Sequence, residues 1–196
     1  IAAMLLLTLR GTPTIYYGEE ICMRDVAIPF EEVQDPQGLN MPDKNLSRDP
    51  ARTPMQWNDS VNAGFSDVKP WLRVARNYSR ENVAVQENDP YSLLTLYRRL
   101  IRLRQNEPAL MTGDYTPIYA DRQAIAYLRG AEGADRFLIV LNLSHRPAYL
   151  KLNDDLAGGT IVLASYPELE GAEVSGNINL NGDEGIIVRL KSTQAL

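Results

Sequence analysis

The sequence predicts an α/β segment followed by an all-β domain, on the basis of three observations. Near the start, an apolar helical stretch leads into a run of β-branched and aromatic residues, which is the order of an α/β unit. A second, amphipathic helix follows a long segment without periodicity. Beyond it, apolar residues recur with period two between turn signals, which favours an antiparallel β-sandwich of Greek-key type. We therefore divide the chain into residues 1–108 and residues 109–196.

The first helix is predicted over the almost wholly apolar stretch Ile1–Leu9. It is too short to span a membrane, and it lacks the basic leader and cleavage site of a signal peptide. A helix that is apolar on every side is typical of a protein interior, so we expect the chain to start inside a larger domain. The following run, Thr12–Tyr17, reads as a buried strand because β-branched and aromatic residues dominate it.

Residues 21–89 show no helical or strand periodicity and contain six prolines. Segments of this kind inside a compact domain are usually functional or disordered. Four large aromatic residues favour a packed loop over a linker. They are Trp57, Phe65, Trp71 and Tyr78.

The second helix is predicted from Pro90 to Asn106, with Asp89 as its N-cap. Leucine and tyrosine residues recur every three or four positions along one face. Four arginines lie on the helix and are equally well explained by a solvated face or by attraction of a phosphate. They are Arg98, Arg99, Arg102 and Arg104.

The second part of the chain reads as short strands separated by turn residues. A predicted turn covers residues 153–155. The expected strands are Tyr115–Tyr119, Ala124–Arg129, Phe137–Leu143, Ala148–Leu152, Thr160–Ala164, Asn177–Leu180 and Gly185–Lys191.

Composition excludes several classes of protein. The chain is 44% hydrophobic and 23% charged, which is typical of folded domains. Its formal charge of −5 disfavours a nucleic-acid partner, because phosphate binding normally requires a basic surface. The single cysteine, Cys22, forms no internal disulfide, favours a cytoplasmic location and is expected to be a small buried hydrophobe. We also expect no membrane partner.

Few residues outside the long loop suggest chemistry. Glu19 and Glu20 are adjacent on an extended chain, so they point in opposite directions, and a polar rim explains them better than a catalytic pair. The only histidine, His145, is expected in a solvent-exposed turn and argues against a multi-histidine metal site. The chain has no glycine-rich phosphate loop. We expect neither a cofactor nor a metal ion.

The most informative stretch is Ser47–Trp57, in which Arg48 and Arg52 lie four residues apart between prolines. Prolines forbid a regular helix there and stiffen the turn. A stiff turn can hold a guanidinium against a carboxylate and sugar-like hydroxyls. The same spacing is equally compatible with arginines that tie the loop to its own backbone.

The chain resembles the C-terminal part of the α-glucosidases of glycoside hydrolase family 13, the α-amylase family. The resemblance covers essentially the whole chain, and its loop motif is specific to the branch that cleaves oligosaccharides. The matching segments are Gly11–Glu20, Arg48–Trp57, Asn62–Phe65, Pro70–Leu72, Asn82–Val83, Asp89–Pro90 and the arginine-rich helix that follows.

The resemblance implies a position for each part of the chain. Residues 1–10 correspond to the seventh helix of a (β/α)8 TIM barrel, Thr12–Tyr17 to its eighth strand and residues 90–106 to its eighth helix. Residues from about 109 onward correspond to the family's C-terminal sandwich domain. Loops after barrel strands build the active site, so the loop of residues 19–89 is expected over the substrate pocket.

The resemblance also implies a function, namely retaining hydrolysis of terminal α-linked glucose from short oligosaccharides. Arg48 is expected to bind the terminal glucose together with a carboxylate from the first half of the barrel. Arg52 is the weaker substrate-binding candidate and serves better as a loop anchor. The three catalytic acids correspond to positions upstream of Ile1, so this chain alone is expected to be inactive.

The expected partners are therefore an α-glucosidic oligosaccharide and the N-terminal part of the same barrel. Two alternatives stay open at this point. One is a trehalose synthase or transglycosylase that shares the loop motif. The other is a non-catalytic, glycosidase-like transporter heavy chain.

Overall fold

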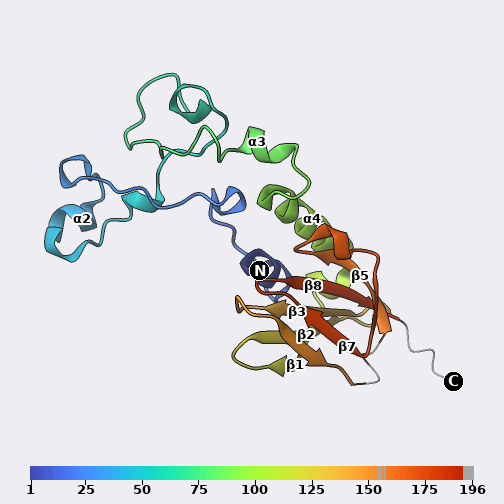
Figure 1. Ribbon diagram of the computed structural model, residues 1–196. Coiled ribbons are helices and arrows are strands. Elements are labelled where there is room, and N and C mark those ends of the chain that lie inside the picture. Colours follow the sequence, from blue (N-terminus) through green and yellow to red (C-terminus); the bar gives the residue numbers. More distant parts are fainter. Residues whose placement is uncertain (154–155, 157, 192–196) are drawn as a thin grey trace. The chain divides into compact units, whose positions relative to one another are not determined.

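The computed structural model describes residues 1–153, 156 and 158–191, and these residues form two compact units (Figure 1). The first unit combines residues 1–14 with the described residues from 96 onward, and the second contains residues 15–95. We describe each unit by itself. The predicted boundary between residues 108 and 109 stays a prediction.

The first unit contains a six-stranded antiparallel sheet in the order β1-β2-β3-β8-β5-β6, and a two-stranded antiparallel sheet, β4-β7 (Figure 1). The strands are β1 (Asp114–Ala120), β2 (Ala124–Gly130), β3 (Phe137–Asn142), β4 (Ala148–Lys151), β5 (Gly158–Ala164), β6 (Glu173–Ser175), β7 (Asn177–Leu180) and β8 (Gly185–Leu190).

The two sheets share one apolar core. Val140 and Val188 of the larger sheet belong to the same buried cluster as Leu150 and Ile178 of the smaller sheet. The strands β4 and β7 alternate buried and exposed residues, as expected for a sheet with one face in the core. Every residue of β3 is buried, and the short helix α1 (Ala2–Thr8) contacts this strand. The apolar sequence of β3 thus reflects burial on both of its faces.

The seven strands predicted after residue 108 are all confirmed, with ends that shift by at most two positions. The strand β6 was not predicted, because three residues with one buried side chain are too few to show alternation. The antiparallel pairing is confirmed, whereas the Greek-key connectivity stays a prediction. The predicted turn at 153–155 includes residues 154 and 155, which lie outside the described residues.

The longest helix, α4 (Leu93–Asn106), is confirmed, but it begins three residues later than predicted. The hydroxyl of Ser92 accepts a hydrogen bond from the backbone N–H of Thr95 at 3.2 Å, which is the geometry of an N-cap. The Asp89 carboxylate instead accepts from the N–H of Tyr91 at 2.9 Å and closes the preceding turn. Two further short helices among the described residues are the turn α5 (Pro108–Met111) and the 3₁₀ turn η7 (Pro167–Leu169).

The prediction that Arg104 lies on a solvated face is wrong, because its side chain is buried, with only 6% of the residue exposed. Its guanidinium donates to the carbonyls of Leu7 at 2.8 Å and Leu9 at 3.0 Å. Carbonyls at the end of a helix have no partner within the helix. Arg104 supplies this partner at the end of α1, and burial lowers the pKa of its guanidinium.

The second unit consists of short helices joined by irregular chain. They are η1 (Glu19–Ile21), η2 (Phe30–Glu32), α2 (Pro36–Asn40), η3 (Pro42–Lys44), η4 (Asp49–Ala51), η5 (Val61–Gly64) and α3 (Val83–Glu87). Ile21, Met55 and Leu94 form a small buried cluster, against which Met23 and Val83 pack. The segment is thus a folded loop with its own core, and helices of one or two turns explain why no periodicity is visible in its sequence.

The predicted buried strand at Thr12–Tyr17 is wrong for the described residues. No strand pairs with this segment, and Ile15, Tyr16 and Tyr17 are exposed. A β-strand is stabilised by hydrogen bonds to a neighbour, so the β-branched and aromatic composition alone does not produce one. Among the described residues, no helix has both the length and the apolar composition required to cross a bilayer.

Candidate functional site

Arg48 forms a two-pronged ion pair with Asp35, thirteen residues earlier in the chain. Its Nε donates to Asp35 Oδ2 at 3.0 Å, and its Nη2 donates to Oδ1. The backbone N–H of Arg48 also donates to Oδ2 at 2.8 Å. The Asp35 carboxylate is fully buried, whereas 54% of the Arg48 side chain is exposed. These hydrogen bonds, the guanidinium contacts first, hold the pKa of Asp35 well below its ordinary value.

Asp49 makes the reciprocal contact. Its Oδ2 accepts from the backbone N–H groups of Gln34 at 2.7 Å and Asp35 at 2.9 Å. Each aspartate therefore holds the backbone of the segment that carries the other. Each is also followed by a proline and stands at the start of a helical turn, α2 and η4 respectively. We call this pairing of residues 34–35 with residues 48–49 the aspartate clasp.

Arg52 lines a different feature, an aromatic pocket of about 480 Å³ in the same unit. Four of the side chains that line it are aromatic rings, each about half exposed: Tyr17, Trp57, Phe65 and Trp71. Glu20 also lines it and accepts a hydrogen bond from the N–H of Gly18 at 2.7 Å. Exposed rings beside a guanidinium provide a stacking surface together with hydrogen-bond donors, which is a combination suited to a polyhydroxylated ring.

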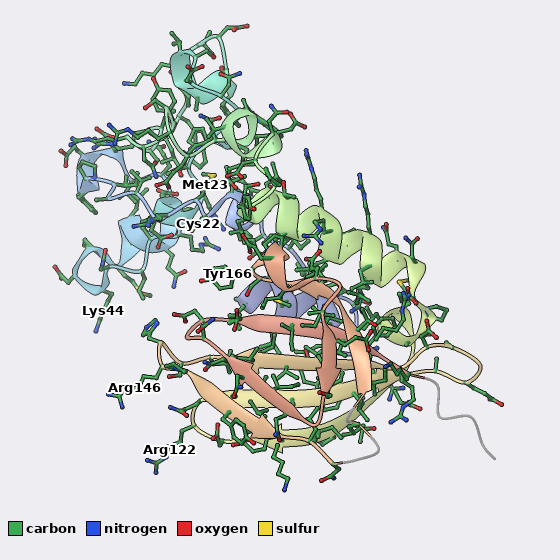
Figure 2. The ribbon with its side chains drawn as sticks, turned by 45° about the vertical axis from the view of Figure 1, so that its right-hand side comes forward. Cys22, Met23, Lys44, Arg122, Arg146 and Tyr166 are labelled. Carbon is green, nitrogen blue, oxygen red and sulfur yellow. The ribbon has the colours of Figure 1, made fainter. Side chains whose placement is uncertain are left out.

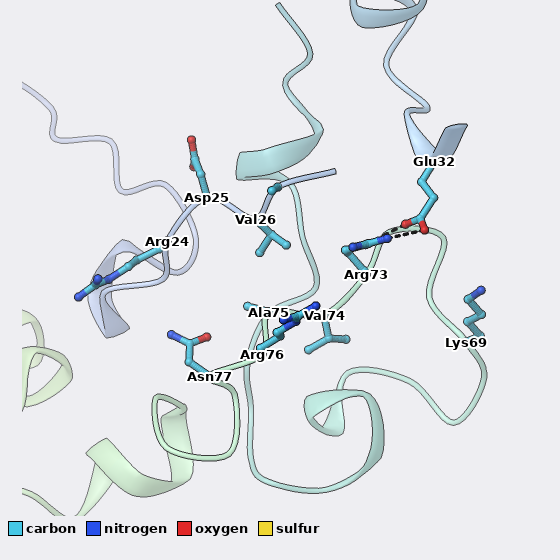
Figure 3. A pocket seen from close by; sticks show the side chains of 11 residues that line it. Arg24, Asp25, Val26, Glu32, Lys69, Arg73, Val74, Ala75, Arg76 and Asn77 are labelled. Carbon is cyan, nitrogen blue, oxygen red and sulfur yellow. Dashed lines mark hydrogen bonds and ion pairs between the residues drawn. The ribbon is translucent and has the colours of Figure 1, made fainter. Parts of the chain in front are cut away.

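A second hollow of the same unit, of about 810 Å³, is open and lined by both charged and apolar side chains (Figure 3). Arg24, Lys69, Arg73 and Arg76 lie along it. The Arg73 guanidinium is paired with Glu32, with its Nε 2.8 Å from Oε2, and both side chains are partly exposed. This pair raises the pKa of Arg73 and lowers that of Glu32.

The remaining candidates lie apart from these features. His145 is exposed as predicted, and its Nδ1 lies 2.6 Å from Asp183 Oδ2, which raises the pKa of the imidazole. The expectation of a buried Cys22 is wrong, because the residue is exposed in a left-handed turn after η1 (Figure 2). No group of three or more histidine, cysteine or acidic side chains suited to a metal ion occurs in the part of the chain that the structure describes.

The two arginines of the motif thus have different surroundings. Arg48 holds a buried carboxylate within the chain, and Arg52 lines the aromatic pocket. Sequence reasoning missed Asp35, although the two Asp-Pro pairs, Asp35-Pro36 and Asp49-Pro50, were a visible signal. It also assigned the aromatic rings to packing, whereas three of the four are exposed on the pocket wall, and the fourth expected ring, Tyr78, is half-buried elsewhere.

The chain belongs to the alpha-amylase family. The family description "Alpha amylase, catalytic domain" matches residues 1–113, which is more than half of the chain. This match covers the aspartate clasp and the aromatic pocket together. Both features therefore lie in the part of the chain that corresponds to a catalytic domain.

Individual relatives have different activities in their names. A probable alpha-glucosidase of Rhizobium meliloti (strain 1021) is 36% identical over 150 residues, covering 76% of this chain and 27% of that protein. The amino acid transporter heavy chain SLC3A1 of Rattus norvegicus is 36% identical over 193 residues, covering 94% of this chain and 27% of that protein. The solved trehalulose synthase MutB from Pseudomonas mesoacidophila MX-45 superposes with a TM-score of 0.87 at 31% identity, covering 97% of this chain and 37% of that structure's chain. The chain therefore spans between 27% and 37% of these relatives' lengths.

Proposed function

We propose that this chain is the C-terminal part of a retaining α-glucosidase that hydrolyses terminal α-linked glucose from short oligosaccharides. Family membership and the alpha-glucosidase relative support a glycosidase. The observation that carries the proposal is the Arg48–Trp57 segment, which presents one half-exposed guanidinium on the aspartate clasp and a second in an aromatic pocket. Both arginines have N–H donors that are suited to sugar hydroxyls.

In this proposal, residues 1–108 complete a (β/α)8 barrel together with an N-terminal part of the protein. Retaining hydrolysis requires a carboxylate nucleophile and a carboxylic acid about 5 Å apart, and both are assigned to that part. The chain itself contributes to binding. Arg48 binds the terminal glucose, and Arg52 with the surrounding rings contacts the sugar at the aromatic pocket. The single cysteine supports a cytoplasmic location.

The experiment is a product analysis of the complete enzyme with maltose and with a nitrophenyl α-glucoside. Proton NMR of the first product should show α-glucose, because two inversions retain the anomeric configuration. Appearance of β-glucose first would contradict a retaining mechanism. The 196-residue chain alone should release no glucose from either substrate, and measurable turnover by it would overturn the assignment of the catalytic acids to the N-terminal part.

Two relatives provide the alternatives. The trehalulose synthase favours an isomerising or glycosyl-transferring enzyme, which would convert a disaccharide into an isomer and release little free glucose. The transporter heavy chain favours a non-catalytic protein, for which the complete protein would show no turnover of any of these sugars. The same NMR assay, run with sucrose as an additional substrate, separates all three outcomes.

A further inference from the structure

The Arg48 guanidinium uses only one of its edges within the chain. An arginine has five N–H donors in a planar fork. Asp35 accepts two of them, from Nε and Nη2, which leaves three. Within the described residues no acceptor is bonded to Nη1, and 54% of the side chain is exposed. The outer edge of the fork is thus available to a ligand while the inner edge is fixed.

The inner edge is held by a carboxylate that is itself buried and hydrogen-bonded on both oxygens. Asp35 is fully buried, and its Oδ1 also accepts from the N–H of Gln37 at 3.4 Å, as the N-cap of α2. Its backbone N–H donates to Asp49. An ionised carboxylate inside a protein requires such partners, because burial of an unpaired charge is costly. The orientation of the guanidinium plane is therefore set by the aspartate clasp.

We propose that Asp35 is a positioning residue for substrate binding: it holds the Arg48 guanidinium so that the Nη1 edge faces the sugar. This inference rests on the proposed function, because it requires that Arg48 binds the substrate. Asp35 does not contact the sugar in this arrangement. It lowers the entropic cost of binding by keeping a long side chain in one orientation before the substrate arrives.

The chain offers a matched control. Glu32 and Arg73 form the same two-pronged pair in the same loop, but both of their side chains are partly exposed (Figure 3). An exposed pair of this kind contributes little to stability. Glu32→Gln therefore removes an equivalent charge without disturbing the clasp, and it should change KM and kcat less than about twofold.

The test is a double-mutant cycle in the complete enzyme, with Asp35→Asn, Arg48→Ala and the double variant. Arg48→Ala should lower kcat/KM by about 30- to 1,000-fold. Asp35→Asn keeps the side-chain volume and an acceptor oxygen, and it should lower kcat/KM by about 10- to 100-fold, mainly through KM. In the Arg48→Ala background, Asp35→Asn should lower kcat/KM less than about twofold, because a residue that acts through Arg48 has nothing left to orient.

The outcomes separate the two claims. If Arg48→Ala has wild-type kinetics, the substrate-binding role of Arg48 in the proposed function fails, and the positioning role fails with it. Suppose that Arg48→Ala lowers kcat/KM. If Asp35→Asn then leaves kcat/KM unchanged, or lowers it by the same factor in the wild type and in Arg48→Ala, only the positioning role is overturned. Additive losses would identify Asp35 as a structural residue of the loop.

A second variant covers the case in which Asp35→Asn does not fold. Asp35→Glu keeps the charge but moves the carboxylate by one methylene, so it should shift the guanidinium while keeping the ion pair. We expect KM to rise about tenfold at a kcat close to that of the wild type. An unchanged KM in a folded Asp35→Glu enzyme would overturn the proposal.

Discussion

The hydroxyl of Tyr127, on β2, lies 2.5 Å from Oγ1 of Thr8, at the end of α1. Thr8 donates its own hydroxyl proton to the carbonyl of Met4. The Tyr127 hydroxyl must therefore be the donor in the contact between the two side chains. Both groups are buried, and their hydrogen bond joins the first helix to the larger sheet across more than a hundred residues of sequence.

Replacement of this donor has a definite expected cost. Tyr127→Phe should lower the free energy of unfolding by about 1 kcal/mol, because one buried hydrogen bond is lost while Thr8 keeps its bond to Met4. Urea unfolding of wild type and variant checks this value. Thr8→Val removes the same hydrogen bond by replacing its acceptor. If Tyr127→Phe has the same free energy of unfolding as the wild type, the hydrogen bond makes no net contribution to stability.

The same tyrosine predicts a loss of stability at alkaline pH. Burial is the main cause that raises the pKa of Tyr127 to about 12, above the value of about 10 for an unfolded tyrosine. The folded state therefore holds the phenol proton more tightly. The resulting stabilisation is fully present below pH 10 and is lost as the pH rises from about 10 to 12.

Melting temperatures recorded between pH 8 and pH 12 test this sign. The wild type should lose stability more steeply than Tyr127→Phe above pH 10, because the phenylalanine has no proton to release. Parallel curves for the two proteins would contradict the prediction.

A buried cation holds the same helix end. Arg129 is fully buried, and its guanidinium donates to the carbonyls of Thr8, Gly113 at 3.0 Å and Asp114 at 3.2 Å. Arg129→Met should lower the free energy of unfolding by about 3 kcal/mol, since three carbonyls lose a donor. Calorimetric melting measures the loss.

Two exposed arginines serve as its controls. Arg122 and Arg146 lie in turns outside the strands, with their side chains in solvent (Figure 2). Methionine at either position should change the stability by less than about 0.5 kcal/mol. An effect of Arg129→Met as small as that of these controls would mean that the carbonyls find other partners.

The aromatic pocket gives a kinetic prediction. Trp71→Ala in the complete enzyme should raise KM for maltose by up to about tenfold at nearly constant kcat, because a stacking surface of the bound sugar is lost. Tyr149 is an equally exposed ring on β4, and Tyr149→Ala should leave KM unchanged. Equal KM values for the wild type and Trp71→Ala would remove this ring from the substrate site.

The sequence alone predicted the parts of the fold that depend on local pattern. Short apolar runs bounded by turn residues, along Phe137–Leu143 and Gly185–Lys191, identified two central strands, because strands that are buried on both faces read as nearly continuous apolar sequence. The leucine repeat in residues 93–103 identified α4 for the equivalent reason. The prolines around Arg48 correctly excluded a regular helix, since the segment forms only the short turn η4.

Only the tertiary structure decided what those elements contact. Arg104 and Arg129 look like surface residues in the sequence, but carbonyls brought near by folding provide their partners. Thr12–Tyr17 has the composition of a strand and forms none, because pairing depends on a neighbour and not on propensity. Arg48 pairs with Asp35, which is buried and lies thirteen residues earlier in the chain. The folding of the loop brings the two side chains together, and their spacing in the sequence does not specify this contact.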